Sequence, residues 1–145
     1  MIRPYQIGDK STLLKLLEMN TPDYFAPSEK EDYIEYLDEK LDQYFVVEEE
    51  GEIIGCGGLN FMKDGRTARI SWDMIHPEHQ GKGIGKKLTQ HRIQEAQKKM
   101  GLETIVVRTS QLAYLFYEKN GFTLDKIEKD FWAKGFDLYQ MSMAI

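Results

Sequence analysis

Apolar residues recur at two different spacings along the chain, and each spacing predicts a different element. A spacing of three or four residues is typical of one face of a helix, and it occurs twice in the first third of the sequence. The apolar positions of these two stretches are Leu13, Leu16 and Leu17, then Ile34, Leu37 and Leu41. Asp9 precedes the first stretch as a candidate N-cap, and Ser28 and Glu31 have the spacing of a capping box before the second. We therefore expect two amphipathic helices in this region.

Shorter runs rich in β-branched and aromatic residues predict strands. The expected strands are 2–6, 44–49, 53–62, 67–75, 104–108, 122–128 and 137–144. Two later helices are expected, from about residue 84 to Met100, before Gly101, and from about Ser110 to Asn120, before Gly121. This order predicts an α+β fold with a mixed, mostly antiparallel sheet. No linker, repeat or low-complexity stretch divides the chain, so we expect one domain over residues 1–145.

Composition narrows the class of protein. The chain has 145 residues, 41% of them hydrophobic and 12% aromatic, which is enough for one sizeable core. The formal charge of −5, from 19 basic and 24 acidic residues, argues against general binding to nucleic acid or anionic membranes. The single cysteine, Cys56, excludes an intrachain disulfide. With no membrane-length apolar run and no signal-like leader, a cytoplasmic protein is expected.

The most informative segment is a glycine-rich loop, residues 80–85, between an expected strand and an expected helix. Glycine has no Cβ, so the backbone can approach a ligand closely. The first turn of the helix offers unpaired N–H groups and the positive end of the helix dipole. Lys82, Lys86 and Lys87 add positive charge beside the loop. The segment therefore predicts a phosphate-binding site.

The glycine spacing excludes two common phosphate loops. A P-loop would need glycine at position 80, which is Gln80, and serine or threonine at position 87, which is Lys87. A dinucleotide-binding fingerprint would need glycine at position 86 or 88, where lysine and leucine stand.

The residues Gln80-Gly81-Lys82-Gly83-Ile84-Gly85 fit the pattern Gln/Arg-x-x-Gly-x-Gly/Ala instead, and this resembles the acyl-CoA loop of the GNAT superfamily of N-acetyltransferases. A second block at 115–122, Leu-Phe-Tyr-Glu-Lys-Asn-Gly-Phe, is similar to that family's Leu-Tyr-Glu-Lys-x-Gly-Phe signature. The resemblance extends over roughly residues 1–143. It implies a GNAT-like fold whose middle strands splay apart, and transfer of the acetyl group of acetyl-CoA to a primary amine by direct attack.

The resemblance also implies where the cofactor lies. Backbone groups of Met74, Ile75 and His76 would hold pantetheine in the gap between the splayed strands. The pyrophosphate would be held by the loop and the helix that follows it. The residues of this second group are Gln80, Gly81, Lys82, Gly83, Ile84, Gly85 and Lys86. Ser110 stands where the family often has an asparagine that contacts CoA, and its hydroxyl would still offer a hydrogen bond.

Two residues are candidates for the chemistry. Tyr117 stands at the tyrosine of the second block, where the family commonly has the general acid, and a neutral phenol can protonate a departing thiolate. Tyr114 is the alternative acid, or a wall of the pantetheine site. The glutamate that many family members place on the preceding strand falls on Arg69, which cannot serve as a base. Two-residue alternation puts Asp73 on the same face as Arg69 and Ser71, where it would receive the amine's proton or bind a cationic acceptor.

The acceptor and the partners are less defined. Seven acidic residues between 28 and 43 would attract an amine, although the charge pattern favours a solvated helix face. His76 and His79 have no third ligand nearby, so no metal is expected. The last strand, 137–144, is expected to be an exposed edge that supports a possible homodimer. Two other functions remain open: a non-catalytic acyl-CoA-binding regulatory module, and a structural protein without a ligand.

Overall fold

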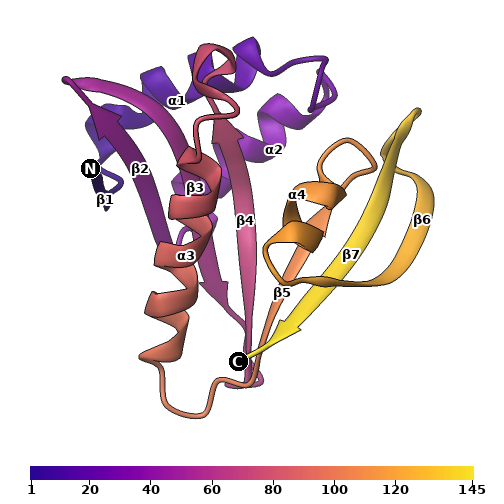
Figure 1. The fold of residues 1–145 in the computed structure, drawn as a ribbon. Coiled ribbons are helices and arrows are strands. Elements are labelled where there is room, and N and C mark those ends of the chain that lie inside the picture. The colour runs from indigo at the N-terminus through magenta and orange to yellow at the C-terminus, as the bar shows by residue number, and fades with distance from the viewer.

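Seven strands form one continuous sheet, and helices cover both of its faces in the computed structural model, which describes residues 1–145 (Figure 1). The strand order is β1-β2-β3-β4-β5-β7-β6, and every neighbouring pair is antiparallel except β4 and β5. The strands are β1 (Ile2–Pro4), β2 (Gln43–Glu49), β3 (Glu52–Phe61), β4 (Thr67–Ile75), β5 (Thr104–Thr109), β6 (Thr123–Ala133) and β7 (Phe136–Ala144). The helical elements are η1 (Ile7–Asp9), α1 (Lys10–Met19), α2 (Glu29–Glu35), η2 (Tyr36–Lys40), η3 (Pro77–His79), α3 (Ile84–Gln97) and α4 (Tyr114–Lys119). The expected α+β class and mostly antiparallel sheet are confirmed.

The helix α1 buries the apolar face that the sequence predicts, whereas the segment formed by α2 and η2 buries only part of its predicted face. Tyr33 and Tyr36 are buried together with Leu37, and Ile34 is only half-buried. Aromatic rings cover more area than an isoleucine side chain, and both rings pack on Tyr44. The chain then widens into the π-helical turn η2, so Leu41 lies beyond the helix.

Neither predicted N-cap forms a capping hydrogen bond from its side chain. An N-cap residue normally has extended backbone angles, but Asp9 and Ser28 are already helical, with φ of −83° and −67°. The Asp9 carboxylate instead binds Arg3 and accepts a hydrogen bond from the Gln6 N–H. At the start of α2, Glu29 accepts a hydrogen bond from the Ala26 N–H at 2.7 Å.

The core is divided between the two faces of the sheet. The helices α1 and α2 pack with β2, β3 and β4 in one cluster, which includes Leu13, Tyr33 and Met74. On the opposite face, α3 and α4 share a second cluster with β4, β5 and β7, which includes Ile70 and Tyr117. None of the helices combines the length and the apolarity that a membrane span requires.

The parallel strands β4 and β5 pair over only four positions, Thr67–Ile70 with Thr104–Val107. Beyond these positions β4 stays paired with β3, and β5 stays paired with β7. The two strands therefore part in the middle of the sheet, which confirms the expected splay (Figure 1).

A β-bulge interrupts β4 just where it leaves β5. Ser71 pairs with Gly58 and Met74 pairs with Cys56, so Trp72 and Asp73 together lie opposite one residue of β3. Trp72 has a left-handed φ of 50°, and its carbonyl accepts a hydrogen bond of 2.8 Å from the Tyr44 hydroxyl. The buried Tyr44 side chain therefore holds the bulge in place.

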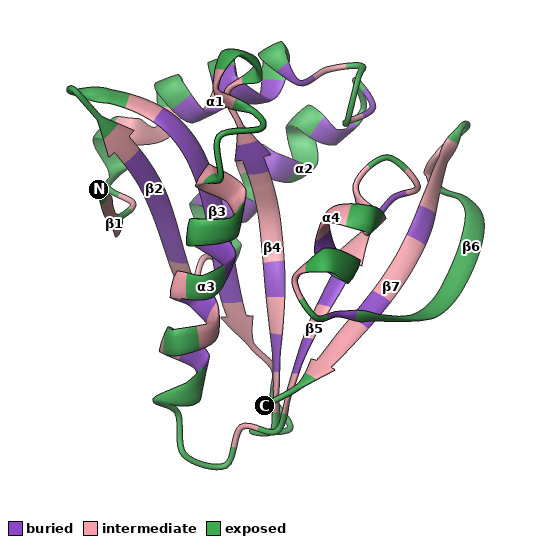
Figure 2. Cartoon of the chain, viewed as in Figure 1, coloured by how far each residue is buried: buried purple, intermediate pink, exposed green.

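The last strand is not an edge. β7 lies between β5 and β6, because the hairpin at Gly135 folds β7 back between them. The edges are β1 and β6, and β6 is exposed along most of its length (Figure 2). The expectation that the last strand is an exposed edge is therefore wrong, and the homodimer stays a prediction without that edge.

Candidate active site

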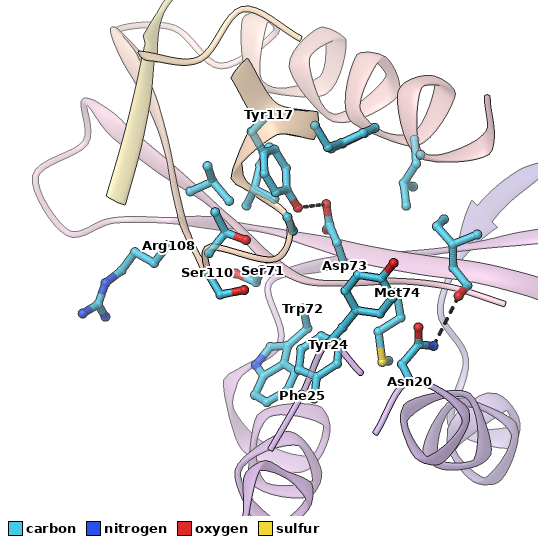
Figure 3. Close-up of a pocket in the computed structure, with 18 of the residues that line it drawn as sticks. Asn20, Tyr24, Phe25, Ser71, Trp72, Asp73, Met74, Arg108, Ser110 and Tyr117 are labelled. Carbon is cyan, nitrogen blue, oxygen red and sulfur yellow. Dashed lines mark hydrogen bonds between the residues drawn. The ribbon is translucent and has the colours of Figure 1, made fainter. Parts of the chain in front are cut away.

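A cleft of about 770 Å³ opens where β4 and β5 part (Figure 3). The glycine-rich loop and the start of α3 line one part of it, and α4 lines another. The loop between α1 and α2 and the strands β4 and β5 complete the walls. The gap in the sheet therefore opens into a cleft that is large enough for a ligand.

The glycine-rich loop has the backbone geometry that glycine makes possible. Gly81 and Gly83 have left-handed φ values of 78° and 80°, and a Cβ added at either would meet no atom within 4 Å. Gly83 is the N-cap of α3, so the unpaired amides of the first helical turn begin directly after it. The result is an open cradle with a partial positive charge, which suits a pyrophosphate.

Most of the predicted cofactor residues line this cleft. They are Met74, Ile75, Gln80, Gly81, Gly83, Ile84, Gly85, Lys86 and Ser110. Lys82 and His76 do not line it. The backbone N–H of His76 is already paired with the Ile54 carbonyl at 2.8 Å, so it is not free for a pantetheine arm. No group of three or more His, Cys, Asp or Glu side chains is arranged to hold a metal ion.

The two sequence motifs touch each other in the structure. The Phe116 ring of α4 packs against Gly85 in the first turn of α3, where an added Cβ would lie 3.1 Å from the Phe116 Cζ. Glycine at this position therefore lets α4, which carries Tyr117 directly after Phe116, approach the glycine-rich loop.

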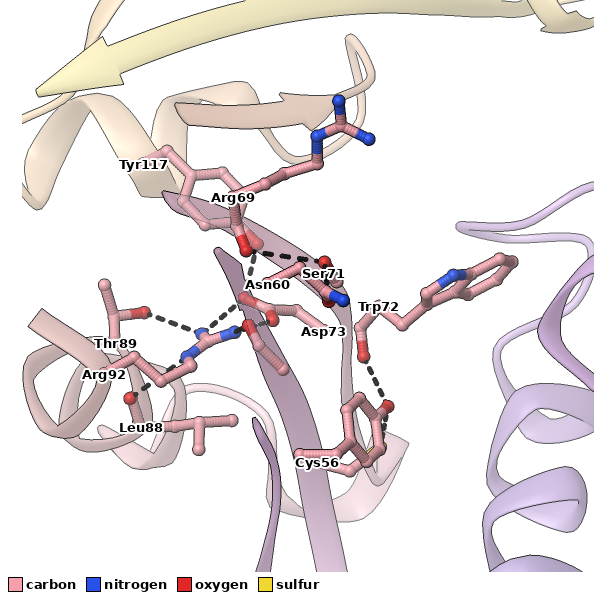
Figure 4. A network of polar contacts seen from close by, with 12 residues as sticks. Cys56, Asn60, Arg69, Ser71, Trp72, Asp73, Leu88, Thr89, Arg92 and Tyr117 are labelled. Atoms are coloured by element: carbon pink, nitrogen blue, oxygen red, sulfur yellow. Dashed lines mark hydrogen bonds and ion pairs between the residues drawn. The ribbon is translucent and has the colours of Figure 1, made fainter. Parts of the chain in front are cut away.

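Three side chains from three elements meet beside the cleft, which Asp73 and Tyr117 line and Arg92 does not (Figure 4). Arg92 of α3 is completely buried and forms an ion pair with Asp73 of β4. Its Nη2 donates to the Asp73 Oδ2 at 2.7 Å, and its Nη1 donates to the Gly58 carbonyl at 3.1 Å. The Tyr117 hydroxyl donates to the same Asp73 Oδ2 at 2.6 Å. Asp73 thus accepts hydrogen bonds from both neighbours.

Burial and the charge of Asp73 shift the pKa values of Tyr117 and Arg92. Burial, and then the negative charge of Asp73, raise the pKa of Tyr117 well above its usual value of 10. Burial alone would lower the pKa of Arg92, but the Asp73 carboxylate outweighs it and raises the pKa. At neutral pH the site therefore contains a protonated phenol and a charged guanidinium.

The expectation that Asp73 shares one face of β4 with Ser71 is wrong, because the bulge lies between them. Asp73 contacts Arg92 on the α3 side of the sheet. The Ser71 hydroxyl instead shares the Asn60 Oδ1 with Tyr36, on the α2 side, at 2.9 and 2.6 Å. The extra residue at the bulge breaks the two-residue alternation between Ser71 and Asp73.

Sequence reasoning missed Arg92. A signal was present, because Leu88, Arg92 and Ala96 are spaced by four residues and all three are buried. A charged residue in the middle of a buried helical face needs a partner of opposite charge. Asp73 is that partner.

Tyr114 is not part of the cleft. Its ring packs on Tyr139 of β7, with ring centroids 4.6 Å apart. Three residues on a helix with 3.6 residues per turn lie about 60° apart, which is enough to separate Tyr114 from Tyr117 here. The expectation that Tyr114 shares the face of Tyr117 in the site is therefore wrong.

The remaining wall of the cleft combines aromatic and charged groups. Phe25, from the loop between α1 and α2, stacks on Trp72 with ring centroids 5.8 Å apart. Of the seven acidic residues between 28 and 43, three line the cleft, namely Glu29, Asp32 and Glu35. The acidic segment is therefore partly a wall of the site and partly a solvated face.

Comparison with known proteins agrees with this geometry. The family model described as "Acetyltransferase (GNAT) family" matches residues 13–122. The amino-acid acetyltransferase of Pseudomonas putida (strain GB-1) is 30% identical over 134 residues, which are 89% of this chain and 29% of that protein. The amino-acid acetyltransferase of Pasteurella multocida (strain Pm70) is 31% identical over 93 residues, 64% of this chain and 21% of that protein. The chain therefore spans less than a third of the length of these relatives.

Solved structures with low sequence identity share the fold. An aminoglycoside 6'-N-acetyltransferase complexed with coenzyme A superposes with a TM-score of 0.80 at 15% identity, covering 99% of this chain and 96% of that one. The ribosomal-protein-S18-alanine N-acetyltransferase from Escherichia coli gives 0.82 at 18% identity, covering 100% and 93%. Since the family model spans most of the chain and both motifs meet in one cleft, the protein belongs to the GNAT acetyltransferase family.

Proposed function

We propose that this protein is an N-acetyltransferase that moves the acetyl group of acetyl-CoA to a primary amine of a small molecule or peptide by direct attack. The observation that carries the proposal is the continuous cleft from the open cradle at Gly81 and Gly83 to the paired side chains of Asp73 and Tyr117. The aminoglycoside acetyltransferase that shares this fold was solved with coenzyme A. The name of the sequence relatives places amino acids among the candidate acceptors. We also propose a cytoplasmic setting, which suits a chain whose single cysteine is free and buried.

The cofactor would lie along β4. The pyrophosphate would bind the amides around Gly81 and Gly83 and the ammonium group of Lys86, and pantetheine would follow the backbone at Met74 and Ile75. This leaves the thioester near the bulge, where β4 and β5 have already parted.

Tyr117 is the proposed general acid. The attacking nitrogen forms the new C–N bond, the C–S bond breaks, and the thiolate takes a proton from the Tyr117 hydroxyl. The amine releases one proton in the same reaction, and Asp73, hydrogen-bonded to Tyr117, lies in position to return that proton to the phenol. Because Arg92 neutralises the Asp73 carboxylate, this relay suits Asp73 better than binding a cationic acceptor does.

A non-catalytic acyl-CoA-binding module is the second candidate. Position 69, where many family members have a glutamate, is an arginine, and the carboxylate nearest the reaction centre is held by a buried ion pair. Both observations weaken the case for an efficient base, and turnover decides between the two functions.

The first experiment is thermal unfolding with and without acetyl-CoA. A ligand at about 100 times its Kd stabilises the fold by roughly 2.7 kcal/mol. With an unfolding entropy of about 0.3 kcal/mol/K for a chain of this length, this corresponds to a shift of about 9 °C. Gly83→Glu should abolish the shift. Gly65→Glu is the matched control, because Gly65 also has a left-handed φ, of 72°, and open space around it, but lies outside the cleft.

The second experiment is turnover on a panel of primary amines. Tyr117→Phe should lower the rate by about 10²- to 10⁴-fold while the acetyl-CoA shift remains, since the phenol acts on the chemical step. A shift without turnover on any amine would support the non-catalytic module. A wild-type protein that shows no shift at saturating acetyl-CoA would refute both.

A further inference from the structure

Two arginines at the part of the cleft farthest along β4 from the glycine-rich loop have no anionic partner. Arg69 of β4 pairs in register with Val106 of β5, so Arg108, two residues further along β5, projects from the same face as a diagonal neighbour. Both are half-buried and both line the cleft. Neither lies within 4.0 Å of a carboxylate, whereas the other arginines that are not exposed, Arg3 and Arg92, are both in ion pairs.

The surroundings fix Arg108 in this position. Its guanidinium carbon lies 4.9 Å from the ring centroid of Phe131 and 5.7 Å from that of Trp132. Burial, and then the positive charge of Arg69, lower the pKa of Arg108 from its usual value, and the negative charge of Glu128 opposes this only in part. Two guanidinium groups held close together without an anion are unfavourable, and a bound anion would relieve the repulsion.

These arginines do not belong to the pyrophosphate site. Ile75, where the strand reaches the loop, is six residue steps along β4 from Arg69, which corresponds to about 20 Å. Figure 3 shows Arg108 at the opposite end of the view from Asn20, with Ser71 and Asp73 between them. The pair thus lies on the far side of Asp73 from the glycine-rich loop, in the part of the cleft that remains for the acceptor.

The chemistry of the pair suits a carboxylate. A guanidinium presents a planar fork of N–H donors that matches the two oxygens of a carboxylate. Negative charge lines another part of the cleft, where Asp32 of α2 forms no ion pair. A small molecule with both an ammonium and a carboxylate would therefore find complementary charges in the same cleft.

We propose that Arg69 and Arg108 bind the carboxylate of the acceptor, and that the acceptor is a small amino acid whose amine is acetylated. This inference rests on the proposed acetyltransferase function and adds its substrate class. The carboxylate is not changed in the reaction. The amine gains the acetyl group and loses one proton, and the thiolate of CoA gains one.

The test compares free L-amino acids with their carboxamides, which keep the amine and lose the negative charge. The wild type should acetylate the best amino acid at least 10-fold more efficiently, in kcat/KM, than its amide. Arg108→Gln and Arg69→Gln should each lower kcat/KM for the acid by about 10- to 100-fold, mainly through KM, and leave the amide unchanged. Arg66→Gln is the control, since Arg66 is an exposed arginine just before β4 and outside the cleft.

Three outcomes would overturn the inference. The first is an equal kcat/KM of the wild type for amino acids and their amides. The second is an equal fall in kcat/KM for acids and amides in the two arginine variants. The third is a higher kcat/KM for aminophosphonates or aminosulfonates than for amino acids. Titration of amino acids into protein saturated with coenzyme A tests the site without turnover, and binding that is lost in Arg108→Gln supports it. An unchanged acetyl-CoA thermal shift in both variants shows that the cofactor site is intact. Absence of that shift in the wild type would instead identify a failure of the proposed function.

Discussion

The buried ion pair between Arg92 and Asp73 predicts a large and asymmetric effect of mutation. Arg92 has no exposed surface, whereas 20% of the Asp73 side chain is exposed at the cleft. Asp73→Asn keeps the shape of the side chain and its hydrogen-bond acceptor but leaves a buried positive charge without its counter-charge. Arg92→Met leaves a carboxylate that water in the cleft can reach. We therefore expect Asp73→Asn to be the more destabilising change.

The magnitude follows from the burial. Removing one partner of a buried pair typically costs about 3–5 kcal/mol. The retained amide oxygen and the partial exposure of position 73 favour the lower end, about 3 kcal/mol. An unfolding entropy of about 2.1 cal/mol/K per residue gives about 0.3 kcal/mol/K for 145 residues, so Tm should fall by about 10 °C.

Thermal unfolding of the four proteins in the double-mutant cycle measures this effect. The double variant Asp73→Asn with Arg92→Met should be more stable than Asp73→Asn alone, because no uncompensated charge remains. A fall in Tm of less than 3 °C for Asp73→Asn would show that Arg92 does not depend on Asp73. A double variant no more stable than Asp73→Asn would refute the charge argument itself.

Three further predictions concern packing and titration. Gly85→Ala should destabilise the fold by about 1 kcal/mol, because the new Cβ presses on the Phe116 ring. Adding Phe116→Leu should remove this loss of stability. If Gly85→Ala stabilises the protein both with and without Phe116→Leu, the contact does not limit residue 85. Four buried tyrosines have raised pKa values, chiefly because burial disfavours the phenolate. They are Tyr33, Tyr36, Tyr44 and Tyr117. Above about pH 10 the unfolded chain releases phenolic protons that the folded chain retains. The free energy of unfolding should therefore fall by about 1.4 kcal/mol per pH unit for each tyrosine. A Tm that does not change between pH 9 and 11 would disprove this. Burial raises the pKa of Cys56 to about 12, so a thiol reagent at pH 8 should label it only after denaturation, and complete labelling of the native protein would show that the thiol is accessible.

Local patterns predicted those parts of the fold that depend on local physics. The glycine-rich loop could be recognised because left-handed backbone at Gly81 and Gly83 requires residues without a Cβ. The start of α3 at Ile84 followed from the same loop. The face of α1 followed from helical periodicity, which is set by neighbouring residues along one element.

Features that depend on contacts between distant segments could not be predicted in this way. The bulge at Trp72 is held by the hydroxyl of Tyr44, 28 residues away in the sequence. No local pattern in β4 predicts this bulge. The expected face of Asp73 failed for that reason. Likewise, β7 is an inner strand because it pairs with β5, and its own sequence does not reveal which neighbours it will have.

The short ladder between β4 and β5 also bears on how the molecule holds together. Only four pairs of residues join the half of the sheet built on β1–β4 to the half built on β5–β7. Beyond that seam, the halves are linked across the cleft by contacts of α4, such as Tyr117 with Asp73 and Phe116 with Gly85. A ligand in the cleft would contact both halves of the sheet where β4 and β5 are not paired. Ligand binding should therefore strengthen the coupling between the two halves, which share only the core cluster of α3 and α4 and the four-residue ladder.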